Sequence, residues 1–99
     1  MNELAVYIEE RVSTMIGKFA TSKAGHDKDK LYVIVSADEK YVYLADGKYK
    51  TAGSPKKKGI KHIQLINETV GEELLDCIMK KEPHIDDAIK YAIKQKLTF

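Results

Sequence analysis

Cysteine and long apolar segments are scarce in this sequence, and their scarcity excludes several protein classes. Cys77 is the single cysteine, so no disulfide can form within the chain. No apolar run approaches the ~18 residues of a membrane-spanning helix, and the charged N-terminal segment is unlike a secretory signal peptide. We therefore expect a cytoplasmic protein with no membrane partner.

The short length limits what the chain can contain. Its 99 residues allow one domain, and a chain of this size buries only about two thirds of its unfolded surface. A large catalytic cavity would take up much of that core, so an enzyme is the least expected class of protein.

Charge is distributed unevenly along the chain. The 17 basic and 15 acidic residues give a net charge of only +2, which alone would not indicate a nucleic-acid partner. Residues 16–66, however, contain 11 lysines and 5 acidic residues, a net of +6, whereas residues 1–15 and 67–99 each sum to −2. A basic centre is thus flanked by mildly acidic ends.

An amphipathic helix is predicted near the N-terminus. Apolar residues recur there at spacings of three and four, which places them on one face of a helix, and Asn2 can act as the N-cap. The helix should run from Asn2 to about Ser13, and Gly17 marks its end. Its apolar face contains Leu4, Tyr7, Ile8, Val12 and Met15.

Two further helices are predicted in the last third of the chain. Thr69 and Glu72 fit a capping box, in which each side chain bonds the backbone NH of the other, and this helix should continue to about Lys81. A proline then breaks the chain, and Asp86 or His84 starts the last helix. In the first of these helices the predicted inward residues are Leu74, Leu75, Ile78 and Met79. In the second, one apolar stripe is formed by Ile85, Ala88, Ile89, Ala92 and Ile93.

The centre of the chain has the alternating period of β-strands. β-Branched and aromatic residues dominate residues 31–35 and 41–45, and Asp46-Gly47 predicts a two-residue hairpin with a positive φ at Gly47. Five antiparallel strands are expected, near residues 17–22, 31–37, 41–46, 48–51 and 61–65. A small barrel is favoured, because closure removes the exposed edges of an open sheet.

Catalytic and metal-binding patterns are not apparent. The three histidines share no metal-ligand spacing with one another or with Cys77, and Cys77 is interpreted as a small core residue beside an apolar stripe. Ser22 and Ser54 have no evident base partner. We expect neither an enzyme nor a bound cofactor or metal.

Two lysine-rich segments could bind phosphates. In the first, Gly25 permits a positive φ and a close backbone approach, and it is flanked by Lys23, Lys28 and Lys30. The second segment contains Lys56, Lys57, Lys58, Lys61 and His62. Each lysine ammonium is a point charge, so it can bind a phosphate without the fixed two-pronged geometry of an arginine. The alternative interpretation is that both segments are ordinary loops kept soluble by their charge.

Tyrosines in the strand region could stack on unpaired bases, an interaction worth about 1–3 kcal/mol per base. Alternation along the strands must bury some of them. Tyr32 and Tyr43 are expected to be partly core residues, so Tyr41 and Tyr49, near turns, are the stacking candidates.

The same segments resemble a known family, the KOW-domain RNA-binding proteins, and in particular short bacterial proteins similar to KOW-type large-subunit ribosomal proteins. The resemblance covers about half of the chain and rests on four segments, Ser22-Lys23-Ala24-Gly25-His26-Asp27-Lys28, residues 31–35, Leu44-Ala45-Asp46-Gly47-Lys48 and Pro55-Lys56-Lys57-Lys58-Gly59-Ile60-Lys61-His62-Ile63. It implies an SH3-like five-stranded barrel that binds ribosomal or other structured RNA through its loops. The family usually has arginine in place of His26 and glycine in place of Asp29.

We therefore expect an α+β fold in one globular unit, with an N-terminal helix (1–15), a KOW or SH3-like barrel (16–66) and a C-terminal helical pair (67–99). The expected function is RNA binding, with ribosomal RNA as partner and ribosomal proteins as further candidates. The expected RNA-binding residues are Lys23, Gly25, His26, Lys28, Lys30, Tyr41, Tyr49, Lys56, Lys57, Lys58, Lys61 and His62. The alternative is a protein-interaction module whose helical faces form a groove or a dimer seam, with the lysines serving solubility.

Overall fold

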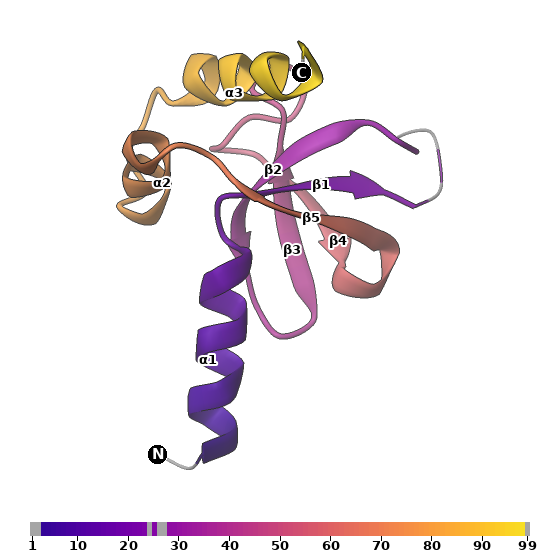
Figure 1. Ribbon diagram of the computed structural model, residues 1–99, viewed down its shortest axis with the longest axis vertical. Coiled ribbons are helices and arrows are strands. Elements are labelled where there is room, and N and C mark those ends of the chain that lie inside the picture. The colour runs from indigo at the N-terminus through magenta and orange to yellow at the C-terminus, as the bar shows by residue number, and fades with distance from the viewer. Residues whose placement is uncertain (1–2, 24, 26–27, 99) are drawn as a thin grey trace.

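The computed structural model describes residues 3–23, 25 and 28–98, except for the side chains of residues 4–8. Its elements follow the order α1 (Glu3–Met15), β1 (Lys18–Ser22), β2 (Leu31–Ala37), β3 (Tyr41–Ala45), β4 (Lys56–Gly59), η1 (Ile60–His62), β5 (Ile63–Thr69), α2 (Glu72–Met79) and α3 (Asp86–Thr98), where η1 is a 3₁₀ turn (Figure 1). The expected α+β class is confirmed. The predicted N-cap, Asn2, and the apolar side chains of Leu4, Tyr7 and Ile8 lie outside the described part.

All five strands form one antiparallel sheet in the order β4-β3-β2-β1-β5. β4 and β5 are its edges, and within the described residues no pairing joins them, so the sheet is not closed and the expected barrel is not confirmed. Register shifts between Lys18 and Phe19 and between Ile34 and Ser36 locally bend the sheet.

Two apolar cores lie on opposite faces of this sheet, because neighbouring residues of a strand point to opposite sides. β2 is buried on both faces, since Leu31, Tyr32, Val33 and Ile34 are each at most 7% exposed. One core contains Phe19, Leu31, Val33, Ala45, Val70, Ile78, Ile85 and Ile89, from strands, α2 and α3. The other contains Met15, Ala20, Tyr32, Ile34, Val42, Leu44 and Ile63.

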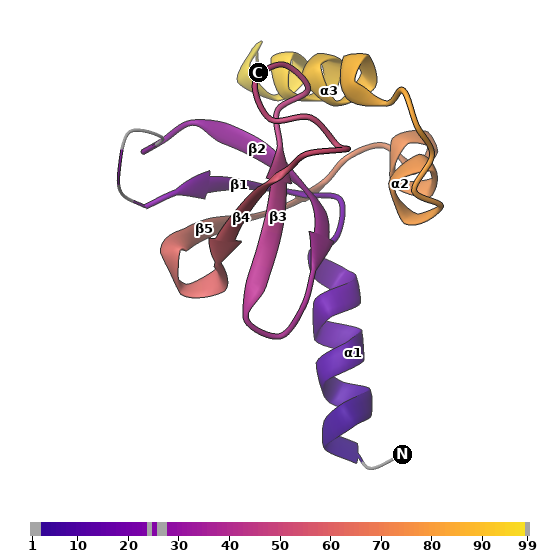
Figure 2. The same ribbon diagram turned by 180° about the vertical axis from the view of Figure 1, so that it is seen from behind.

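The three helices have different relations to the sheet. α2 and α3 cover one face, whereas α1 extends away from the rest of the molecule in both views (Figures 1 and 2). The last turn of α1 does reach the second core, through Met15 and the partly buried Val12. As predicted, the helix ends before Gly17, which has a φ of +86° and donates its NH to Ile34 O at 2.7 Å. No helix in the described residues is long and apolar enough to cross a membrane.

The segment after β3 differs from the predicted hairpin. Residues 48–51 do not form the expected strand; the fourth strand is β4, the lysine run expected to be a loop. Gly47 has the predicted positive φ of +79°, but the Asp46 carboxylate accepts hydrogen bonds from the three NH groups that follow Gly47. This side-chain cap closes a wider turn, so the chain does not return directly as a strand.

The predicted capping box is also wrong. Thr69 ends β5, and the next residue, Val70, donates its NH to Gly17 O at 2.9 Å. Strand geometry therefore extends through Thr69, and α2 begins at Glu72 with Gly71 as an N-cap that makes no side-chain bond. α2 ends at Met79, whose side chain is 51% exposed and not inward as predicted. The predicted start of the last helix at Asp86 is confirmed.

Candidate nucleic-acid interface

The three consecutive lysines lie on an edge strand, and they do not share one face. Lys56 pairs with Leu44 and Lys58 with Val42, whereas Lys57 pairs with Tyr43. Residues directly opposite each other in an antiparallel pair point to the same side. Lys56 and Lys58 therefore lie on the side of the second core, and Lys57 lies on the other side.

Burial and neighbouring charge distinguish these lysines further. Burial, with the positive charge of Lys58, lowers the pKa of Lys56. The Lys57 ammonium lies 4.2 Å from the centroid of the Tyr41 ring, a cation–π contact on the exposed side of the β3–β4 pair. The lysine run thus presents its charge in two directions and cannot follow successive phosphates along one line.

η1 joins the second lysine segment to the glycine loop. Lys23 donates its NH to His62 O at 3.0 Å, which fixes the start of the β1–β2 loop against the end of η1. At the other end of η1, Ile60 donates its NH to Lys40 O at 3.0 Å. Lys23, Lys61 and His62 are exposed, and Lys58 is two residues before η1. We call the group Lys23, Lys58, Lys61 and His62 the η1 surface.

Local geometry holds His62 within this surface. Gly59 lies beneath its imidazole, because a Cβ added at Gly59 would be 3.1 Å from His62 Cδ2. Glycine at this position therefore lets the ring lie against the backbone without displacement.

The glycine loop has the backbone geometry that the sequence predicts. Gly25 has a φ of +88°, and its carbonyl accepts a hydrogen bond from the Lys28 NH at 3.2 Å. A Cβ at Gly25 would meet no atom of the described residues within 4 Å, and Gly25 is itself exposed. Lys28 is exposed, and the predicted site residue His26 lies outside the described residues.

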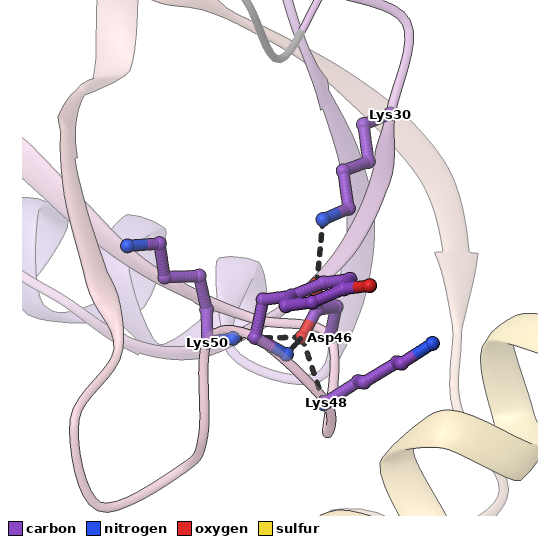
Figure 3. A network of polar contacts seen from close by, with 5 residues as sticks. Lys30, Asp46, Lys48 and Lys50 are labelled. Carbon is purple, nitrogen blue, oxygen red and sulfur yellow. Dashed lines mark hydrogen bonds and ion pairs between the residues drawn. The ribbon is translucent and has the colours of Figure 1, made fainter.

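Lys30 belongs to a different group, centred on Asp46 (Figure 3). Its ammonium lies 2.8 Å from Asp46 Oδ2, while Asp46 Oδ1 accepts bonds from the NH groups of Lys48, Tyr49 and Lys50 at 2.8–2.9 Å. Burial alone would raise the pKa of Asp46, but these donors lower it to about 2. The hydrogen bond to Asp46 raises the pKa of Lys30. Much of the Lys30 charge is thus neutralised within the protein.

The exposure of the four strand-region tyrosines agrees with the prediction. Tyr32 is fully buried and Tyr43 partly buried, whereas Tyr41 is 38% and Tyr49 70% exposed. The ammonium groups of Lys30 and Lys48 lie 4.8 and 5.0 Å from the centroid of the Tyr49 ring. Both stacking candidates therefore have accessible rings beside positive charge.

Apart from Lys56, which lies opposite Leu44 in β4, and His26, which lies outside the described residues, the predicted site residues form three groups. These are the η1 surface beside the glycine loop, the Tyr41–Lys57 pair, and the Asp46 turn with Lys30 and Tyr49. Sequence reasoning missed the contact between Lys40 and η1 and the capping role of Asp46. An aspartate that opens a turn before glycine is a signal for such capping.

Metal binding finds no support in the geometry: in residues 3–23, 25 and 28–98, no group of three His, Cys, Asp or Glu side chains could hold a metal ion. In comparisons with known proteins, no protein-family model and no curated protein matches this chain.

Proposed function

We propose that this protein binds structured RNA, with ribosomal RNA as the first candidate, through the η1 surface. The observation that carries the proposal is the hydrogen bond from the Lys23 NH to His62 O, which brings two basic segments that are far apart in sequence together. Lysines on fixed neighbouring loops can neutralise adjacent phosphates and position the protein on a nucleic acid. An SH3-like fold of the KOW type belongs to the same proposal, and five antiparallel strands together with the resemblance of residues 22–63 support it.

The salt dependence of binding tests this proposal. The variant Lys23→Ala/Lys61→Ala should flatten the slope of log K against log salt for ribosomal RNA by about 1.4–1.8, at 0.7–0.9 per phosphate contact. Lys94→Ala, on the exposed side of α3, is the control and should leave the slope unchanged. No measurable affinity at low salt, or a double variant with the parental slope, would refute the proposal.

Lys57 and Lys58 provide a sharper comparison because they are neighbours on opposite faces of β4. Lys58→Ala should flatten the slope of log K against log salt by about 0.7–0.9, the contribution of one phosphate contact. Lys57→Ala should leave the slope nearly unchanged, since Lys57 lies over Tyr41 on the other face. Equal effects of the two substitutions would show that the RNA contacts the edge of β4 and not the η1 surface.

A protein-interaction module is the second candidate. It is favoured by α1, which extends away from the sheet and packs on the second core only near its end, within the described side chains (Figure 1). A mass in solution that rises with protein concentration, without co-purified nucleic acid, would support this alternative.

A further inference from the structure

An apolar groove lies between α2 and α3, away from the η1 surface. It has a volume of about 910 Å³. Its floor includes Phe19, Val70 and Ile85, all at most 8% exposed. Its walls come from the two helices, which lie on the same side of the sheet and meet at an angle (Figure 1), and from the non-helical residues 68, 69, 71 and 82–84. The wall residues used below are Leu74, Cys77, Ala88 and Tyr91.

The rim of this groove is acidic. Glu68, Glu73 and Glu82 line it, and Glu68 forms an ion pair with Lys96. In the described part of the chain, neither Glu73 nor Glu82 has such a partner. Glu82 accepts a hydrogen bond from the Cys77 thiol, which raises the pKa of Cys77 and keeps the thiol neutral. Among the described residues, Glu73 and Glu82 therefore stay outside any ion pair, while the Glu82 charge helps to raise the pKa of nearby Lys80.

The walls of the groove restrict the conformation of a partner. Helices α2 and α3 use their backbone groups internally, so the helical part of the lining, which is Glu73, Leu74 and Cys77 in α2 and five residues of α3, offers few donors or acceptors to a bound chain. An extended peptide would lose backbone hydrogen bonds in the apolar groove, whereas a helix satisfies its own. Apolar side chains at helical spacing could then enter between Leu74 and Ala88.

We infer that the groove between α2 and α3 binds an amphipathic helix of another protein, whose apolar face is flanked by lysine or arginine. The basic flanks would complement Glu73 and Glu82, and complementary charge selects one partner over another. Helix α1 of a second copy does not fit this description, because residues 1–15 carry a net charge of −2.

Two synthetic helical peptides test the inference with the full chain. Both have about 18 residues, enough to form a helix, with leucines at i, i+3, i+4 and i+7; the other positions are lysine in one peptide and glutamate in the other. By fluorescence anisotropy, the lysine peptide should bind at least about tenfold more tightly. Glu73→Lys/Glu82→Lys should reverse that preference, whereas the control Glu10→Lys/Glu39→Lys should retain it, because both control residues lie outside the groove.

A substitution inside the groove separates specific docking from simple charge attraction. Ala88→Gln places a longer polar side chain at an exposed position of the wall without changing the charge. It should weaken the binding of both peptides at least about fivefold. Circular dichroism checks that each variant is folded. The inference fails if the lysine peptide does not bind, if the preference is not reversed, or if Ala88→Gln has no effect. It also fails if sedimentation shows self-association that the lysine peptide does not disrupt, since a second copy would then occupy the groove.

Discussion

Three glycine-to-alanine substitutions separate backbone strain from close packing in this fold. Gly25 and Gly47 have nearly the same left-handed conformation, with φ of +88° and +79°. They differ in surroundings, because a Cβ at Gly25 would meet no atom of the described residues within 4 Å, whereas one at Gly47 would lie 2.2 Å from Asp86 O and 2.9 Å from the Lys90 NH nitrogen. A Cβ at Gly53 meets nothing within 4 Å, and its φ lies outside the left-handed range.

These differences predict a graded series of stabilities. Gly53→Ala should be neutral or stabilise slightly, since alanine restricts the unfolded chain. Gly25→Ala should cost about 1–2 kcal/mol for the left-handed conformation. Gly47→Ala should cost the same amount plus about 1–3 kcal/mol of overpacking against α3, because backbone atoms of the first turn of α3 would have to move.

Urea unfolding and thermal melting measure the series. For a domain of about 100 residues, each kcal/mol lowers Tm by about 4–8 °C, so Gly47→Ala should melt at least about 8 °C below the parent protein. Equal losses for Gly25→Ala and Gly47→Ala would refute the close approach of the Asp46 turn to α3. A neutral Gly25→Ala would refute the left-handed conformation of the glycine loop.

Two further predictions concern buried polar groups. Asp46 has a pKa of about 2, below its ordinary value of 3.8, so its carboxylate should stabilise the fold at neutral pH by about 2 kcal/mol, and this contribution should be lost as the pH falls from about 4 to 2. Asp46→Asn should flatten the stability–pH curve in that window, and an unchanged curve would argue against the Lys30–Asp46 pair. The Tyr32 hydroxyl is buried and, among the described residues, has no hydrogen-bond partner, so Tyr32→Phe should change stability in urea by less than about 1 kcal/mol. A larger loss would reveal a partner for that hydroxyl.

Local sequence patterns predicted the elements that have a periodic apolar side. The strand near residues 31–37 was recognisable because it is rich in β-branched and aromatic residues, and α3 follows an apolar stripe with helical spacing. β4 has no such pattern, since its sequence is Lys-Lys-Lys-Gly. It forms a strand by pairing with β3, and this tertiary pairing outweighs the low strand propensity of lysine and glycine.

The candidate site was predictable in residue type but not in arrangement. The sequence identifies the lysines, yet the face on which Lys57 or Lys58 lies depends on the β3–β4 register, which a run of identical residues does not specify. The pairing of Lys30 with Asp46 depends on the wide turn after β3, which the sequence wrongly predicted to be a two-residue hairpin. The contact between Lys23 and His62 requires the β1–β5 pairing, which joins residues 41 to 51 positions apart and leaves no local signal.

The central position of β2 determines how the domain should come apart. Because this strand is buried on both faces, loss of either apolar core removes half of the support for the same strand. We therefore expect the sheet, α2 and α3 to unfold as one cooperative unit, with no stable form that retains one core alone. The amide protons of β2 should then exchange with solvent only through global unfolding, while those in the outer turns of α1 exchange through local fraying.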